Sequence, residues 1–221
     1  MTPGTVIDVG AAHGDFTRTT AAVFPDAAYH LIEPLKEYDP FLRDIREGPS
    51  KTTVHQIAAT EKSGEIVLNV HPDLVGSSIF REAEGPGVDG VARTVPAITL
   101  DELARDHRLA SPFLIKADVQ GAELRVLEGA REILPATALV ILEVSFQPFF
   151  DGGPEHARVI SFMESQGFVV YDVLGLSRRP LDGALAQADL VFARHDGPLR
   201  ADHRFATPEQ RKKLTERLKR R

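Results

Sequence analysis

The chain has 221 residues, of which 43% are hydrophobic and 26% are charged, and its formal net charge is −6 at pH 7. This composition is ordinary for one globular domain with a buried core and excludes a mostly disordered chain. The absence of cysteine excludes disulfides and cysteine-ligated metal centres. The acidic balance argues against a nucleic-acid partner. No apolar run approaches the roughly 20 residues of a membrane span, and no secretory signal is recognisable, so we expect a cytoplasmic protein.

Short apolar segments alternate with helical patterns along most of the chain. We expect seven core strands, at residues 5–9, 28–32, 53–59, 113–119, 139–145, 168–173 and 190–193. Four helical patterns separate them, at residues 15–24, 37–46, 122–133 and 155–166. This alternation predicts a doubly wound α/β fold with a mostly parallel sheet. The last two strands have no helix between them, so they are predicted to form an antiparallel hairpin.

Two segments depart from this alternation. Residues 64–96 contain strand patterns at 65–70 and 91–95 around a stretch rich in Gly, Pro and Ser, which predicts a strand-containing insertion in a single domain spanning residues 1–200. Residues 201–221 form a basic C-terminal tail, with seven Lys or Arg residues between 208 and 221. Thr207-Pro208-Glu209 is a typical helix start, so the tail is predicted to be helical.

The strongest signal for a binding site is the sequence VIDVGAAHGDF at residues 6–16. A strand passes through a glycine-containing turn into a helix, which offers free backbone N–H groups to a ligand. The dinucleotide fingerprint GxGxxG would need glycine where the chain has Ala12 and Asp15, and no GxxxxGK[ST] phosphate loop is present. The loop therefore indicates a nucleoside-like ligand without a diphosphate.

S-adenosylmethionine fits this combination of features. Its carboxylate can meet backbone N–H groups of the loop at Gly10, Ala11 and Gly14, and its ammonium can meet Asp8. Glu33 ends the second strand, where a carboxylate can accept hydrogen bonds from both ribose hydroxyls. The adenine is expected near Gln56 and Ala58, which close the third strand.

The sequence resembles the FkbM family of S-adenosylmethionine-dependent methyltransferases. The similar segments are VIDVGAAHGDFT, LIEP, VPAITLDEL, FLIKADVQGAELRVLEGA and ILEVSF, spread over residues 5–194. The most specific is the KxDxxGxE pattern at residues 116–123. The resemblance implies a class I methyltransferase (Rossmann-like) fold and O-methylation of a hydroxyl on a sugar or secondary metabolite.

Three carboxylates lie near the carboxyl ends of the fourth and fifth strands, where ligands of open α/β sheets bind. Asp118 follows the fourth strand, Glu143 lies toward the end of the fifth, and Glu123 begins the intervening helix. Asp118 is the candidate general base for an acceptor hydroxyl. Mg²⁺ held by Asp118 with Glu143 or Glu123 would serve the same purpose by acidifying that hydroxyl. His13, inside the glycine loop, is a second candidate base on the acceptor side.

The sequence thus predicts a methyltransferase with a small hydroxylated acceptor. We expect the 71–96 part of the insertion to cover the acceptor pocket, possibly together with a second subunit of a homodimer. An NAD-dependent oxidoreductase is a rival interpretation, which the missing glycines count against. A non-catalytic domain that binds the cofactor as a scaffold is another, which the Asp118 cluster counts against.

Overall fold

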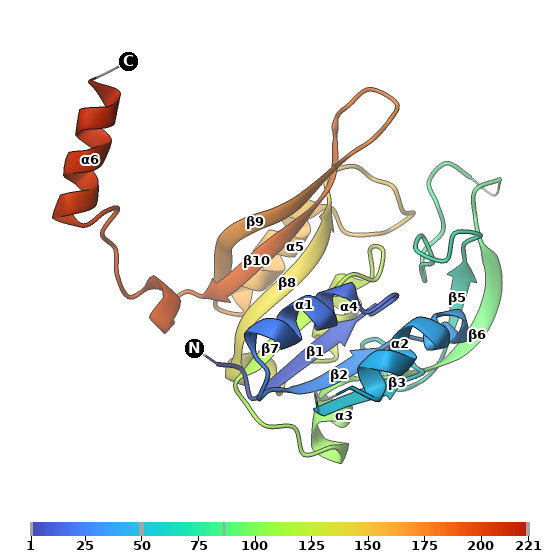
Figure 1. Ribbon diagram of the computed structural model, residues 1–221. Helices are drawn as coiled ribbons and strands as arrows, with labels where there is room; N and C mark the ends of the chain where they lie inside the picture. The colour runs from blue at the N-terminus through green and yellow to red at the C-terminus, as the bar shows by residue number, and fades with distance from the viewer. Residues whose placement is uncertain (1, 49–50, 86, 220–221) are drawn as a thin grey trace.

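The computed structural model describes residues 2–48, 51–85 and 87–219. Its centre is one seven-stranded sheet in the order β3-β2-β1-β7-β8-β10-β9 (Figure 1). The strands of this sheet are β1 (Thr5–Val9), β2 (Ala28–Ile32), β3 (Lys51–His55), β7 (Phe113–Ala117), β8 (Thr137–Ser145), β9 (Phe168–Arg178) and β10 (Leu185–Arg194). Neighbouring strands are parallel except that β10 runs antiparallel to both β8 and β9. The predicted doubly wound fold with an antiparallel last hairpin is confirmed.

Helices cover both faces of this sheet. They are α1 (Asp15–Val23), α2 (Asp39–Arg46), α3 (Leu100–Asp106), α4 (Glu123–Glu128) and α5 (His156–Ser165). Successive side chains of a strand point to opposite faces. In β1, Val6 joins a hydrophobic cluster with Leu42 and Ile45 of α2, whereas Ile7 joins a second cluster with residues of α3, α4 and α5. The strands are therefore buried on both sides, as expected for a parallel sheet.

A second sheet of three strands, in the order β4-β6-β5, lies beside the first. It consists of β4 (Ala58–Ala59), β5 (Gly64–Val70) and β6 (Val91–Ile98). The segment 53–59, predicted as one strand, is divided between the two sheets. The chain leaves the large sheet at His55, turns through an Ile57 N–H to His55 carbonyl hydrogen bond of 3.0 Å, and pairs with β6 at Ala58.

Three further elements differ from the sequence expectation. Helix α3 was not predicted, although Thr99 caps it by accepting a hydrogen bond from the Glu102 N–H at 3.1 Å. Helix α4 ends at Glu128, earlier than predicted, because Gly129 packs against the Thr60 carbonyl, where a Cβ would lie only 2.2 Å away. The strands of the final hairpin are much longer than expected, and residues predicted as a loop pair instead along β9 and β10.

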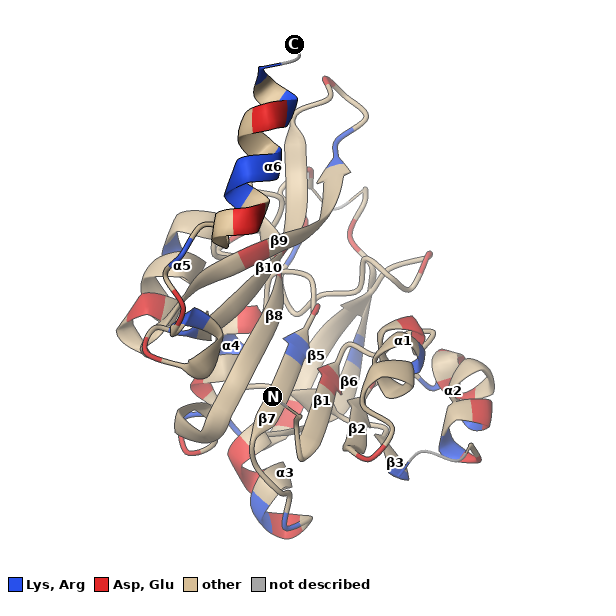
Figure 2. Ribbon diagram, turned by 60° about the vertical axis from the view of Figure 1, so that its left-hand side comes forward, with Lys and Arg blue, Asp and Glu red and all other residues tan. Residues whose placement is uncertain are grey.

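Beyond the hairpin, a 3₁₀ turn (Pro198–Arg200) leads to helix α6 (Pro208–Leu218), none of whose residues is buried. Figure 1 shows α6 apart from the sheet, and Figure 2 shows bands of both charge signs along it. Arg220 and Arg221 of the predicted basic tail lie outside the described residues. In the part of the chain that the structure describes, no helix is long and apolar enough to cross a membrane.

Candidate active site

Two pockets meet at the carboxyl ends of β1 and β7. We call them the Glu33 pocket, with about 700 Å³ of empty volume, and the Asp189 pocket, with about 730 Å³. Gly10, Ala12 and Asp118 line both pockets. Asp118 thus lies where a ligand in one pocket would meet a ligand in the other.

The glycine loop brings β1 close to β7. Gly10 has φ +73°, and a Cβ at this position would lie 2.0 Å from the Asp118 carbonyl oxygen. Only glycine combines this left-handed conformation with so close an approach. Gly14, with φ +81°, plays a different part, because its missing Cβ leaves room for Ile45 and Leu42 of α2. Gly14 lines neither pocket, and its predicted ligand contact stays a prediction beside this packing role.

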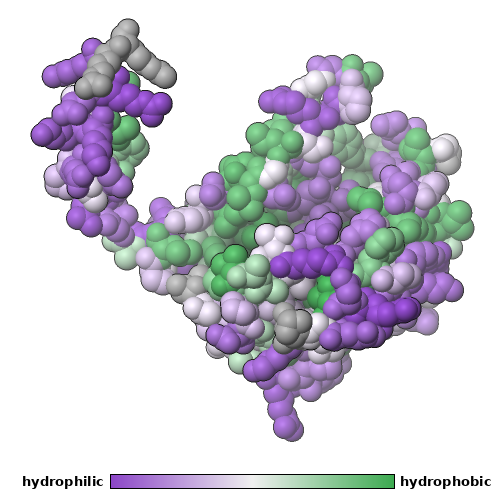
Figure 3. Space-filling model, in the orientation of Figure 1, coloured by the Kyte–Doolittle hydropathy of each residue, from purple (hydrophilic) through white to green (hydrophobic). Residues whose placement is uncertain are grey.

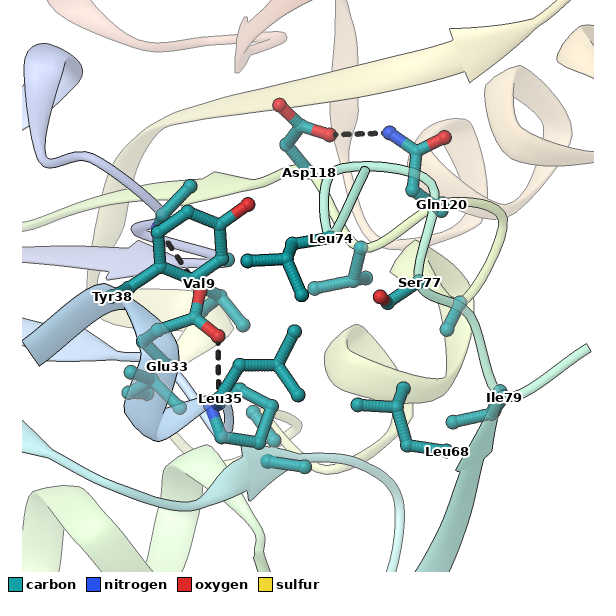
Figure 4. Close-up of a pocket in the computed structure, with 18 of the residues that line it drawn as sticks. Val9, Glu33, Leu35, Tyr38, Leu68, Leu74, Ser77, Ile79, Asp118 and Gln120 are labelled. Carbon is teal, nitrogen blue, oxygen red and sulfur yellow. Dashed lines mark hydrogen bonds between the residues drawn. The ribbon is translucent and has the colours of Figure 1, made fainter. Parts of the chain in front are cut away.

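Glu33 lies at the wall of its pocket, as the sequence predicts (Figure 4). Its carboxylate accepts hydrogen bonds from the backbone N–H groups of Ala12 at 3.0 Å and Leu35 at 2.9 Å. Burial raises the pKa of Glu33 to about 7, although these two hydrogen bonds oppose the rise. The carboxylate is thus fixed in place with lone pairs left for a ligand's hydroxyl groups.

The other predicted cofactor contacts divide into two groups. Ala58 lines the Glu33 pocket, together with Ala59, which the sequence interpretation did not single out. Gln56 is exposed and lines neither pocket, because the chain turns away from the large sheet at His55. Ala11 lines the Asp189 pocket rather than the Glu33 pocket. The contacts of Gln56 and Ala11 with the nucleoside-like ligand stay predictions.

Asp8 lies below the site and not in it. Its side chain is fully buried, accepts a hydrogen bond from the Thr17 hydroxyl at 2.7 Å and lies 3.7 Å from the Lys116 ammonium. Burial raises the pKa of Asp8, against the opposing effects of Lys116 and Thr17. Asp8 lines neither pocket, so the predicted direct contact with a ligand ammonium is replaced by a contact with Lys116.

Lys116 holds Asp8, the glycine loop and Asp118 together. Its ammonium lies 3.4 Å from the Asp118 carboxylate and donates to the Gly10 carbonyl at 3.2 Å. Burial by itself would lower the pKa of Lys116, but the carboxylates of Asp8 and Asp118 outweigh that effect and raise it. Lys116 therefore remains a cation whose charge is already shared between two carboxylates.

Asp118 and Glu143 are brought together as predicted, with Gln120 between them. The Gln120 amide donates to Asp118 at 3.1 Å and to Glu143 at 2.9 Å, and the Gln187 amide donates to the same Glu143 oxygen at 2.7 Å. Burial and then the Asp118 charge raise the pKa of Glu143 to about 8. Glu143 lines neither pocket, so it acts on a ligand only through its neighbours.

Glu123 is held by the turn that precedes its own helix. Its carboxylate accepts hydrogen bonds from the backbone N–H groups of Val119 at 3.0 Å and Gly121 at 3.2 Å, and its residue is almost completely buried. This arrangement fixes the 118–122 turn and leaves Glu123 away from both pockets. Among the described residues, no group of three His, Cys, Asp or Glu side chains is arranged to hold a metal ion.

His13 is exposed on the rim of the Asp189 pocket. Its ring contacts Tyr38 and Phe41 edge to face, with centroids 5.0 Å and 4.6 Å apart. These aromatic contacts give His13 a packing role, and its action on an acceptor stays a prediction.

The insertion contributes residues to the Glu33 pocket. Leu74, Ser77 and Ile79 line the Glu33 pocket, and Figure 4 shows them facing Glu33 and Leu35 across it. The insertion is anchored there by Ser78, whose hydroxyl donates to the Gln120 carbonyl at 2.7 Å. The described insertion residues thus line the Glu33 pocket, and the prediction that residues 71–96 cover the acceptor pocket stays a prediction.

Two functional positions had little signal in the sequence. Tyr38 lines the Glu33 pocket, and its buried hydroxyl has no hydrogen-bond partner among the described residues. Asp189 lines the second pocket from β10, a segment predicted as loop. Asp189 pairs in register with Glu143, so the two side chains lie on the same face of the sheet. Residue alternation along β10 would predict this placement if the length of the hairpin were known.

A family model described as the methyltransferase FkbM domain matches residues 8–170. The chain belongs to this family. The match includes the glycine loop, Glu33, the insertion and the KxDxxGxE segment of the FkbM domain, and it ends within β9.

Two curated relatives are methyltransferases, and the name of one of them specifies a hexuronic acid. The chain is 26% identical over 162 residues to the 2-O-methyltransferase NoeI of Sinorhizobium fredii, which covers 66% of this chain and 65% of that protein. It is 26% identical over 141 residues to the hexuronic acid methyltransferase AglP of Haloferax volcanii, which covers 62% of this chain and 54% of that protein. The chain thus matches between about half and two thirds of the length of these relatives.

A solved FkbM methyltransferase from Methylobacillus flagellatus KT has the same fold. It is 17% identical, with a TM-score of 0.53, and the match covers 85% of this chain and 43% of that one. Membership of the FkbM family gives no support to the rival interpretation of an NAD-dependent oxidoreductase.

Proposed function

We propose that this FkbM-family protein is an S-adenosylmethionine-dependent O-methyltransferase that acts on a sugar hydroxyl. The observation that carries the proposal is the position of Asp118 and Gly10, which line both the Glu33 pocket and the Asp189 pocket. The family, the similarity to a 2-O-methyltransferase and the similarity to a hexuronic acid methyltransferase support the same reaction class.

The Glu33 pocket suits S-adenosylmethionine. Glu33 would accept hydrogen bonds from the ribose hydroxyls, and Ala58 and Ala59 give an apolar surface for the adenine. The unpartnered Tyr38 hydroxyl, buried at the same pocket, offers a donor and acceptor for a polar ligand atom. The carbonyl-rich, acidic surroundings of Gly10 and Asp118 suit the positively charged methionine end. The cofactor supplies an electrophilic methyl group to an acceptor placed in the Asp189 pocket.

Asp118 is the residue that we assign to the acceptor proton. As an alcohol oxygen attacks, its proton must leave, and a positioned carboxylate contributes roughly 10²–10⁴-fold to such a step. Lys116 and the Gln120 amide fix the orientation of Asp118. Glu143, with its pKa raised to about 8 by burial and by Asp118, retains its proton near neutral pH and so avoids a second negative charge beside the base.

A magnesium-dependent version of the reaction has less support. One oxygen of Glu143 already accepts two amide hydrogen bonds, from Gln120 and Gln187. The Lys116 cation lies against Asp118. Amide donors and a lysine are poor neighbours for a divalent cation, which prefers oxygen ligands. We therefore expect direct proton removal by Asp118.

The test is a screen of simple glycosides for release of S-adenosylhomocysteine, with mass spectrometry of the product. We expect methylated glycoside to form. We also expect the rate to be unchanged in 5 mM EDTA, a concentration on the order of 10⁻³ M that is far above the concentration of any trace metal. Loss of turnover in EDTA, restored by Mg²⁺, would replace direct proton removal with metal assistance. Cofactor binding without transfer to any hydroxylated acceptor would favour the scaffold interpretation. The homodimer stays a prediction, which light scattering in solution would test.

A further inference from the structure

Asp189 presents a free carboxylate to the acceptor side of the site. It lies on β10, lines the Asp189 pocket and, among the described residues, takes part in no hydrogen bond or ion pair. Asp189 pairs in register with Glu143 of β8, so both side chains project from the same face of the sheet. Asp189 does not line the Glu33 pocket, so a cofactor there leaves its carboxylate available to a second ligand.

The charge around this pocket is negative. Asp118 and Asp189 both line it, and Lys116 is its only lysine or arginine among the described residues. Lys116 is already shared between Asp118, at 3.4 Å, and the buried Asp8, at 3.7 Å. Asp15, on the rim, is exposed and lies 3.5 Å from Arg18, so it adds little. An acceptor carboxylate placed here would meet two carboxylates and no uncommitted cation.

The part of the pocket beside Asp189 is apolar, because β8 and β9 flank β10 in the sheet. Leu174 of β9 and Ile141 of β8 line it. Leu174 is 48% exposed, and Figure 3 shows a hydrophobic area over this part of the hairpin. A pyranose ring has an apolar C–H face and a rim of hydroxyl groups. Such a ring can lie against Leu174 and Ile141 and direct a hydroxyl toward Asp189.

We propose that Asp189 is a specificity-determining residue that selects a non-anionic sugar as the acceptor and disfavours a uronic acid. This inference rests on the proposed function and goes beyond it, because it names the charge class of the acceptor. The carboxylate accepts a hydrogen bond from an acceptor hydroxyl or amine, and it repels an acceptor carboxylate.

The experiment compares kcat/KM for the methyl glycosides of glucose, glucosamine and glucuronic acid, with wild-type protein and with Asp189→Asn. For the wild type we expect the glucoside and the glucosaminide each to exceed the glucuronide by about tenfold or more. In Asp189→Asn the ratio of glucuronide to glucoside kcat/KM should rise at least about fivefold, because the repulsion is removed while the size is kept. A charge-assisted hydrogen bond is also lost, so the glucoside rate itself should fall.

Asp172→Asn is the matched control, because Asp172 is exposed on β9 of the same hairpin and its side chain contacts only its own neighbour, the Val173 N–H. Its selectivity should equal that of the wild type. Calorimetric titration with S-adenosylhomocysteine should give the same affinity for all three proteins. A wild type that prefers the glucuronide, or an unchanged ratio in Asp189→Asn, would overturn the inference and leave the proposed function standing. No transfer to any of the three glycosides would contradict the proposed sugar methyltransferase itself, and this inference with it.

Discussion

Glu33 combines two properties that usually exclude each other, since it is almost completely buried and yet is placed to hold a polar ligand. Two backbone N–H groups hold its oxygens, and burial raises its pKa to about 7. Its ionised form has more lone pairs for hydroxyl donors than its protonated form. Ligand binding and ionisation of Glu33 should therefore favour each other.

Replacement of Glu33 by Gln should weaken binding of S-adenosylhomocysteine about tenfold or more, because charge-assisted hydrogen bonds are worth roughly 1.5–3 kcal/mol. In the wild type, affinity should rise as the pH increases through about 7, the pKa of Glu33, since the carboxylate is the better acceptor. In Glu33→Gln this dependence should be lost. Calorimetric titrations between about pH 6 and pH 8 measure both effects. This range extends about one unit on each side of the pKa of Glu33. Glu65→Gln, an exposed change on β5, is the control, and equal affinity of Glu33→Gln and wild type would remove Glu33 from the site.

At the scale of elements, the insertion between β5 and β6 contributes residues to the site. Its residues Leu74, Ser77 and Ile79 form a wall of the Glu33 pocket. Ser78 connects this wall to the turn that carries Asp118, by donating to the Gln120 carbonyl and accepting from the Phe80 N–H at 3.0 Å. Ser78 is thus one of the anchors of the insertion, beside backbone hydrogen bonds such as that from the Ala83 N–H to the Phe149 carbonyl at 2.7 Å.

Ser78→Ala should loosen this wall, because it leaves the Gln120 carbonyl and the Phe80 N–H without their partner. An unsatisfied buried group costs roughly 1–3 kcal/mol. We expect faster amide hydrogen exchange across residues 71–90 and several-fold weaker binding of S-adenosylhomocysteine. Ser165→Ala, at the exposed end of α5, should change neither measurement. Unchanged exchange and affinity in Ser78→Ala would show that the insertion is held by other contacts.

The elements that could be predicted from sequence are those with a local signal. The strands and the glycine loop around Gly10 have continuous apolar residues followed by a turn that requires glycine, and this pattern also located Glu33 and Asp118. The single strand 53–59 was predicted wrongly, because the pairing of Ala58 with β6 is a contact between distant segments. The same limitation hid Asp189, whose place in the site depends on the length of the β9–β10 hairpin.

For the whole molecule, the buried ionisable groups predict how stability depends on pH. Burial raises the pKa of Glu33 and Glu123 to about 7 and that of Glu143 to about 8, from an ordinary value of 4.5. The folded protein therefore retains protons that the unfolded chain has lost, and the free energy of unfolding falls as pH rises through this window. His30 and His55, with pKa values lowered by burial from 6.5 to about 4, act in the opposite direction, but only below about pH 6.5.

The ligand-free protein should therefore lose stability as the pH is raised from about 6.5 to 8.5, where only the carboxyl groups contribute. Glu143→Gln keeps the shape and an acceptor oxygen but cannot ionise. Its free energy of unfolding should fall less over this range, by on the order of 1–2 kcal/mol, than that of the wild type. Urea denaturation of both proteins at several pH values measures the difference. Parallel curves for the two proteins would mean that Glu143 is already ionised in the folded state.

The most direct test of the account concerns Asp118, because the proposed chemistry depends on its place between the two pockets. Asp118→Asn keeps the size of the side chain and cannot accept the proton of an acceptor hydroxyl. At saturating S-adenosylmethionine, its single-turnover rate of methyl transfer to the best glycoside should be at least about 10²-fold below that of the wild type. Its affinity for S-adenosylhomocysteine should remain within a few-fold, and Asp26→Asn, an exposed substitution, should match the wild type in both. An Asp118→Asn protein that transfers the methyl group at the wild-type rate would contradict the assignment.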